Sequence, residues 1–180
     1  MSVNLNKNEI DEVKKLIKQK EFDKAIAKLE LTKNNNNPET YFLLGTLYLN
    51  KQKIDKAEQN LKISSKLDIN NPRSFHNLGV LNLVKKNTRE AKSFFELACS
   101  KDKNYINSLI ELGKIYEDEN NFTQAKNFYF KALEIENNNY TVNFRIAKLL
   151  HNNYYFKEAS EYYKKSIGFI RFKNSKHEII

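Results

Sequence analysis

A period of 34 residues runs through most of this 180-residue sequence and limits what it can fold into. Three of the four glycines, Gly45, Gly79 and Gly113, are separated by 34 residues each. A second series has the same spacing, except that its first member stands 32 residues before the next: Ala25, Ala57, Ala91, Ala125 and Ala159. Each of these alanines ends a similar short motif, namely FDKA, IDKA, TREA, FTQA or FKEA. A fixed period of this length is typical of a protein built from stacked repeats.

Within each repeat the apolar pattern predicts two amphipathic helices, an A helix and a B helix, joined by a short polar turn. Gly and Pro together number six, too few for an all-β protein with many tight turns. Asparagine-rich segments such as NNNNP and DINNP separate the repeats, and their prolines suit the first position of a helix. Helices are expected near residues 6–19, 22–33, 38–50, 54–67, 72–85, 88–101, 106–119, 122–136, 140–152 and 156–172.

Gly79 lies in the middle of an expected A helix, where glycine costs about 1 kcal/mol relative to alanine. We expect the A and B helices of the repeat to cross at this glycine, because a residue without Cβ lets two backbones approach closely. The alanines near the start of the B helices would serve the same purpose. Leucine at position 79 is therefore expected to be badly tolerated, although it is the better helix former.

The sequence resembles the tetratricopeptide repeat, with its 34-residue unit and the pattern aromatic-x-x-Leu-Gly-x-x-Tyr, then Ala-x-x-x-aromatic. In the second repeat the residues that fit this pattern are Tyr41, Leu44, Gly45, Tyr48, Ala57 and Leu61. The third and fourth repeats fit similarly, the fifth is weaker, and the first is degenerate in its leading half. The resemblance implies an all-α, right-handed solenoid of five stacked hairpins. One array is expected over residues 1–172, with repeats at about 6–37, 38–71, 72–105, 106–139 and 140–172, and a polar tail at 173–180.

Motifs that carry chemistry are scarce. The single cysteine, Cys99, excludes an internal disulfide, and the three histidines are too far apart to form a metal pair on one helix. The sequence has no Gly-rich phosphate loop, no HExxH and no nucleophile elbow. The EDE run at 117–119 is interpreted as a solvated helix end. We therefore expect no catalytic residue, no cofactor and no metal, and a protein that is not an enzyme.

The net charge of +9 is spread along the chain rather than gathered in one block. Lysine supplies 27 of the 31 basic residues, and lysine is less suited than arginine to bidentate phosphate or base recognition. This composition argues against nucleic acid as the main partner. The N-terminus lacks a signal-peptide core, and no apolar run is long enough to span a membrane. A cytoplasmic location is the expectation.

The resemblance implies that function rests on the concave face lined by the A helices, where a solenoid offers an extended binding surface. The residues expected to form a peptide-binding groove there are Phe42, Leu49, Arg73, His76, Asn77, Val80, Leu83, Lys114, Phe144, Arg145 and Lys148. Leu43 and Val84 add to the apolar part of this face. The apolar residues would anchor a peptide or helix of another protein, and the basic residues would favour acidic partners. The alternative interpretation, that the apolar residues only pack against neighbouring A helices, stays open.

Two function classes fit such an array. The first is a scaffold or adaptor that binds protein partners. The second is an N-terminal arm that presents a substrate or partner to a larger enzyme, for example a transferase, whose catalytic part is absent from this chain. The sequence ends with an apolar group that has no obvious cover, made of Ile167, Phe169, Ile170 and Phe172. A long last helix that packs back, a self-association surface, or continuation into a longer protein would each explain it.

Overall fold

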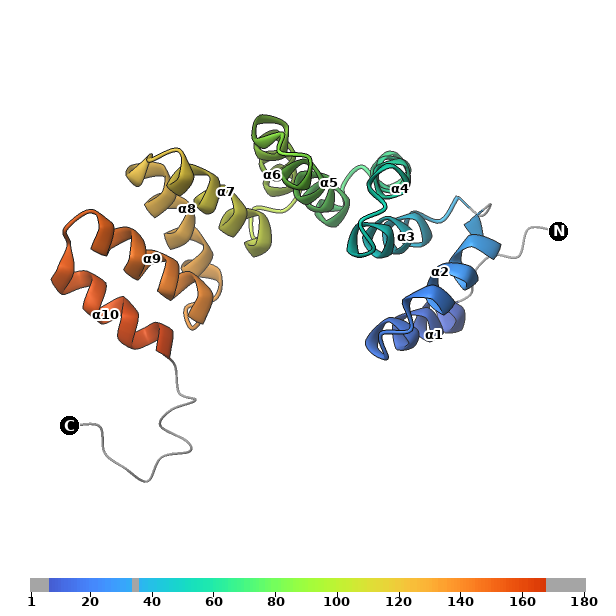
Figure 1. Cartoon of the computed structure of the whole chain (residues 1–180), viewed down its shortest axis with the longest axis horizontal. Helices are drawn as coiled ribbons and strands as arrows, with labels where there is room; N and C mark the ends of the chain where they lie inside the picture. The colour runs from blue at the N-terminus through green and yellow to red at the C-terminus, as the bar shows by residue number, and fades with distance from the viewer. Residues whose placement is uncertain (1–6, 34–35, 168–180) are drawn as a thin grey trace, which may run out of the picture. The chain divides into compact units, whose positions relative to one another are not determined.

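The computed structural model describes residues 7–33 and 36–167, which form a series of helical hairpins (Figure 1). These residues contain ten α-helices and no strand: α1 (Lys7–Lys18), α2 (Phe22–Leu31), α3 (Pro38–Asn50), α4 (Ile54–Leu67), α5 (Pro72–Val84), α6 (Thr88–Lys101), α7 (Ile106–Asp118), α8 (Phe122–Ile135), α9 (Tyr140–Asn152) and α10 (Phe156–Ile167). The predicted all-α fold of helical hairpins is confirmed. The expected end of the last helix and the polar tail, residues 168–180, lie outside the described residues, as do three of the four residues of the C-terminal apolar group.

The hairpins group into two compact units. The N-terminal unit, Met1–Asp102, holds α1 to α6, and the C-terminal unit, Lys103–Ile180, holds α7 to α10. Within each unit, helices that follow one another along the chain pack together, and α3 also contacts α5, the next A helix. The A helices are α1, α3, α5, α7 and α9, and each is followed by its B helix.

Two of the A helices begin as their sequence indicates. Asn37 and Asn71 are the N-caps of α3 and α5, and each accepts a hydrogen bond from the backbone N–H two residues later, at 2.9 and 3.1 Å. Pro38 and Pro72 occupy the first helical position, where a missing N–H costs little. The Asn-Pro pairs thus fix where these helices start.

The periodic glycines face large side chains of the B helices. A Cβ atom on Gly79 would lie 2.6 Å from Cε1 of Phe95, a ring that is fully buried. The same relation, between residues sixteen apart, holds for three pairs: Gly45 with Leu61, Gly79 with Phe95, and Gly113 with Tyr129. At Gly79 and Gly113 the three nearest atoms all belong to a B-helix ring, so a side chain and not the backbone takes the space there. At Gly45 the backbone N of Leu61 also lies 3.1 Å from the added Cβ, so the expected close approach of two backbones is seen at this position. The alanines of the second series lie in the core, at most 1% exposed.

Each turn between an A helix and its B helix contains a residue in the left-handed region. The five residues have φ between 56° and 67°: Lys20, Gln52, Lys86, Asn120 and Tyr154. In the third hairpin the N–H of Lys86 donates to the carbonyl of Leu83 at 2.9 Å, and the N–H of Asn87 donates to the carbonyl of Asn82 at 2.8 Å. This pair of bonds is the Schellman motif, which ends a helix and favours glycine at the residue with positive φ.

Replacing Lys86 by glycine is expected to stabilise the N-terminal unit by roughly 0.5–1 kcal/mol, because a side chain at positive φ carries a Cβ clash that glycine lacks. The measurement is the urea midpoint of unfolding, followed by circular dichroism. The matched control is Lys85→Gly, one residue earlier at φ −74°, where glycine adds backbone freedom and also removes the ion pair of Lys85 with Glu58, so this variant should destabilise. Shifts of the same sign in both variants would contradict the assignment.

Candidate functional site

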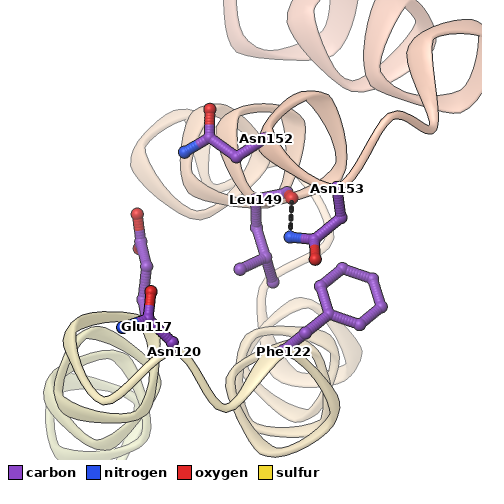
Figure 2. Close-up of a pocket in the computed structure, with 6 residues that line it drawn as sticks. All are labelled: Glu117, Asn120, Phe122, Leu149, Asn152 and Asn153. Atoms are coloured by element: carbon purple, nitrogen blue, oxygen red, sulfur yellow. Dashed lines mark hydrogen bonds between the residues drawn. The ribbon is translucent and has the colours of Figure 1, made fainter.

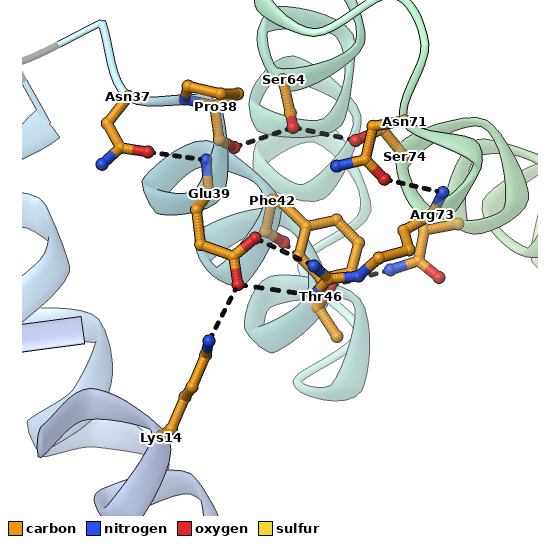
Figure 3. Close-up of polar contacts among 11 residues, drawn as sticks. Lys14, Asn37, Pro38, Glu39, Phe42, Thr46, Ser64, Asn71, Arg73 and Ser74 are labelled. Carbon is orange, nitrogen blue, oxygen red and sulfur yellow. Dashed lines mark hydrogen bonds and ion pairs between the residues drawn. The ribbon is translucent and has the colours of Figure 1, made fainter. Parts of the chain in front are cut away.

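The A helices of the N-terminal unit carry a polar network around Glu39 (Figure 3). Arg73, on α5, donates to both carboxylate oxygens of Glu39, on α3, at 3.0 and 3.5 Å. Lys14, on α1, lies 3.4 Å from the same carboxylate. One carboxylate therefore links three successive A helices. Because these side chains are partly exposed, the network contributes little to stability and mainly fixes where they lie.

The guanidinium group of Arg73 also covers the ring of Phe42. Its Cζ atom lies 3.9 Å from the ring centroid, a stacking distance. Phe42 is 8% exposed and Leu43 is 7% exposed. Both residues are therefore largely enclosed, which agrees with the alternative interpretation that they pack against neighbouring helices, and a role of Phe42 in binding stays a prediction. A ligand could contact the covered face of the Phe42 ring only after Arg73 moved away.

Asn77 is engaged with the neighbouring A helix. Its side-chain amide donates to Oγ1 of Thr46 at 2.8 Å, and the Thr46 hydroxyl donates to the carbonyl of Phe42 at 2.8 Å. The side-chain amide of this predicted groove residue thus already has a partner on α3. His76 is half-buried and tilts against Phe95, with ring centroids 5.4 Å apart.

The remaining apolar residues of this face stay partly open. Leu49 on α3 and Val80 and Leu83 on α5 are half-buried, and Val84 is 54% exposed. We call these four residues the α3–α5 apolar strip. Since α3 and α5 contact each other, the strip belongs to two neighbouring hairpins of the N-terminal unit.

The predicted basic residues of the C-terminal unit each lie near a carboxylate. Lys114 is 2.7 Å from Glu111 on the same helix. Arg145 and Lys148, on α9, lie 3.7 and 4.0 Å from Glu117 on α7. Their attraction for an acidic partner is therefore weakened by acidic residues of their own unit.

Phe144 is the most open of the predicted aromatic groove residues, at 51% exposed. Its ring meets that of Tyr163 edge-on, with centroids 5.9 Å apart. His151 packs against Phe156 and Tyr163 at 5.2 and 6.3 Å. These four side chains form a partly exposed aromatic cluster on the hairpin of α9 and α10.

Glu117 is largely enclosed, in contrast to the interpretation of EDE as a solvated helix end. Its side chain is 13% exposed and its Oε2 accepts a hydrogen bond from the hydroxyl of Tyr129 at 2.8 Å. Burial, and next the hydrogen bond to Glu117, raise the pKa of Tyr129. Asp118 and Glu119 are exposed, as expected. The run therefore has one inward-facing carboxylate and two outward-facing ones.

A pocket of about 170 Å³ lies in the C-terminal unit between the α7–α8 turn and the end of α9 (Figure 2). Its lining residues are Glu117, Asn120, Phe122, Leu149, Asn152 and Asn153. The side-chain amide of Asn153 donates to the carbonyl of Leu149 at 2.8 Å. The sequence did not reveal this pocket. Three of its six lining residues are asparagines, and the general richness in asparagine hid this signal.

Over residues 7–33 and 36–167, no group of three or more His, Cys, Asp or Glu side chains is placed to hold a metal ion. None of the helices there is both long and apolar enough to cross a bilayer.

The tetratricopeptide repeat family matches the sequence over residues 38–68 and 106–139. The first match spans α3 and α4, and the second spans α7 and α8, so each unit contains a matched hairpin. The chain is a tetratricopeptide repeat protein. The three other tetratricopeptide hairpins carry the same buried alanine near the start of the B helix, at Ala25, Ala91 and Ala159.

Solved structures share this tetratricopeptide fold. MamA is 24% identical with a TM-score of 0.73, over 86% of this chain and 92% of that one. PilF of Pseudomonas aeruginosa is 18% identical with a TM-score of 0.82, over 95% and 77%. YrrB, described as a TPR protein with an unusual peptide-binding site, is 16% identical with a TM-score of 0.66, over 88% and 83%. At these identities the likeness shows the fold alone. The sequence matches no curated protein.

Tyr48 fits the tyrosine of the tetratricopeptide pattern. Because its hydroxyl is hydrogen-bonded in the folded chain, we expect the protein to lose stability at alkaline pH. Its hydroxyl donates to Glu30 Oε1 at 2.8 Å, and burial together with this bond raises its pKa from 10.0 to about 12. The folded state therefore holds the proton more tightly than the unfolded chain. The stability that this provides is complete below pH 10 and is lost as the pH rises from 10 towards 12.

The measurement is the urea midpoint of wild type and Tyr48→Phe between pH 9 and pH 12, a range set by the raised pKa of about 12. The phenylalanine variant should lose less stability over this interval than wild type. Tyr154→Phe, at a residue 82% exposed, is the control and should follow wild type. Parallel curves for Tyr48→Phe and wild type would show that the buried phenol is not responsible.

Proposed function

We propose that this chain is a protein-interaction scaffold that binds a peptide or helix of another protein on the A-helix face of its N-terminal unit. The observation that carries the proposal is the α3–α5 apolar strip, whose side chains stay partly exposed although their helices pack together. A row of partly exposed apolar side chains bordered by charges is typical of a surface that a partner covers. Stacked repeats present such surfaces along successive A helices.

The chemistry of this face favours an amphipathic ligand. Apolar side chains of the ligand would pack on Val80, Leu83 and Val84, as in other helix-in-groove and peptide complexes. A carboxylate of the ligand would compete with Glu39 for Arg73, since a guanidinium group prefers a bidentate acid partner. Release of Arg73 from Glu39 would uncover the ring of Phe42 and add an aromatic anchor. In this proposal Phe42 anchors the ligand only after Arg73 has moved away from its ring.

Two other function classes are less well supported. An arm that presents a substrate to a separate catalytic chain would use the same surface, and no described contact favours it over a scaffold. Nucleic-acid binding would need cations free to meet phosphates, whereas Arg73, Lys114, Arg145 and Lys148 each lie near a carboxylate.

The test is a selection of peptides from a random displayed library against the purified full chain. Binding of the selected peptides is then measured by fluorescence polarisation for wild type and Val80→Glu/Val84→Glu. The matched control is Ile63→Glu/Leu67→Glu, which places the same two charges four residues apart on α4, at side chains 37% and 41% exposed. Circular dichroism checks that both variants remain helical.

The expected result is that wild type and the α4 control bind the same amphipathic peptides, and that the α5 variant binds them at least about tenfold more weakly, as for loss of an interface anchor. Equal binding by both variants would show that the strip is packing and not a binding surface. A library that yields no binder would also count against the proposal. Selected sequences that are purely basic or unpatterned would contradict the expected amphipathic ligand.

A further inference from the structure

The pocket at the end of α9 differs from the A-helix strip in place and in chemistry, and we infer that it binds an arginine side chain of a protein partner. At about 170 Å³ it is smaller than the roughly 300–1,000 Å³ typical of sites for small molecules and cofactors. A single amino-acid side chain is therefore the class of ligand that its size admits. Figure 2 shows Glu117 and Asn120 on one side of it and residues of α9 on the other.

Glu117 supplies unused acceptor capacity to this pocket. A carboxylate has about four lone-pair sites, but over the described residues this one accepts a single hydrogen bond, from Tyr129. Arg145 and Lys148 approach it at 3.7 and 4.0 Å, beyond normal hydrogen-bond distances. An entering donor can therefore bond to the carboxylate directly, in competition with these two longer-range attractions.

The backbone around the pocket also favours a cation. Helix α7 ends at Asp118 and α9 ends at Asn152, while α8 begins at Phe122, so two helix C-termini and one helix N-terminus adjoin the pocket. Because a helix C-terminus carries about half a negative charge and an N-terminus about half a positive one, the helix ends leave a net negative contribution. The amide group of Asn153 donates to Leu149, which leaves its Oδ1 as an acceptor. Together with the Glu117 carboxylate, these groups favour a donor-rich cation over an anion, although Arg145 and Lys148 nearby offset part of the negative charge.

Arginine fits this lining better than lysine. The guanidinium group carries five donors in a plane, which can divide between the Glu117 carboxylate and the asparagine side-chain oxygens. Its flat face can stack on the ring of Phe122 in competition with the ammonium group of Lys126, which lies 5.9 Å from the ring centroid. The same ring is stacked with Tyr155 at a centroid distance of 5.7 Å. The side chain of Leu149 can contact the aliphatic stem.

The test is a titration of the full chain with N-acetyl-arginine methylamide, followed by NMR of the asparagine side-chain amides. Matched titrations use the citrulline derivative, which keeps the shape without the charge, and the lysine derivative. The variants are Glu117→Gln, which can still accept from Tyr129, and Lys148→Gln, which removes a competing cation. Glu134→Gln, on the exposed surface of α8, is the control.

The expected result is a saturable shift of the amides of Asn120, Asn152 and Asn153 with the arginine derivative. Glu117→Gln should weaken binding about tenfold, as for loss of a charge-assisted hydrogen bond, while Lys148→Gln should strengthen it and Glu134→Gln should not change it. Equal shifts with citrulline, equal affinity for lysine, an unchanged Glu117→Gln titration or no saturable shift would each overturn the inference.

The inference rests on the proposed function in one respect only, namely that the arginine side chain belongs to a protein that this chain binds. The amino-acid derivative examines the pocket without that partner, and the library selection examines the α3–α5 apolar strip without the pocket. A failure of one proposal is therefore distinguishable from a failure of the other.

Discussion

Gly79→Ala is expected to lower the free energy of unfolding of the N-terminal unit by about 1–3 kcal/mol, the usual cost of overpacking a core. Alanine would by itself stabilise the helix by about 1 kcal/mol, so the packing effect must outweigh this gain. Three ring atoms of Phe95 lie 2.6, 2.7 and 2.9 Å from the position of the added Cβ. Since Phe95 is fully buried and His76 packs against it, the ring cannot move aside without displacing its neighbours.

To test the role of the ring, Gly79→Ala is also made in a protein that carries Phe95→Val, which removes the ring but keeps an apolar side chain. In that background the clash is relieved, and Gly79→Ala should become neutral or stabilising by up to about 1 kcal/mol. The urea midpoints of the four proteins, followed by far-UV circular dichroism, give the coupling between the two positions. A loss of stability of the same size in both backgrounds would mean that Phe95 does not determine the need for glycine at position 79.

The helices of this fold could be predicted because their signals are local. The 34-residue period, the Asn-Pro pairs before α3 and α5, and the polar turns each act within one hairpin. The partner of each glycine was also within reach, because Leu61, Phe95 and Tyr129 repeat with the same spacing as the glycines they face. The division after Asp102 was not predictable, since the KDKN segment there looks like the segments between other repeats.

The exposure of the site residues was harder to predict, because it depends on side chains from the next hairpin. Phe42 and Phe144 occupy the same place in their repeats, 102 residues or three periods apart, yet one is 8% and the other 51% exposed. Arg73, from the hairpin after α3 and α4, covers Phe42. Within the described residues no hairpin follows α10, and Phe144 has no equivalent cover. From their position in the repeat alone, Phe42 and Phe144 would be predicted to be equally exposed.

Phe42→Glu is therefore expected to destabilise the N-terminal unit severely, by about 3 kcal/mol or more, which is the range for an uncompensated buried charge. The new carboxylate would lie among buried apolar neighbours such as Leu43 and Leu47. Attraction to Arg73 offsets only part of this cost, because Arg73 already pairs with Glu39. The same substitution would remove the ring on which Arg73 stacks, so the network around Glu39 should loosen as well.

Phe144→Glu is the matched variant, and it is expected to cost only about 1 kcal/mol, because the side chain is already half in water and loses chiefly its edge contact with Tyr163. Hydrogen exchange measured by mass spectrometry separates the two effects within one molecule. In Phe42→Glu the amides of α3 to α5 should lose protection, whereas in Phe144→Glu those of α9 and α10 should change little. Similar protection in both variants would mean that Phe42 is as accessible as Phe144. A ligand could then contact Phe42 without any movement of Arg73.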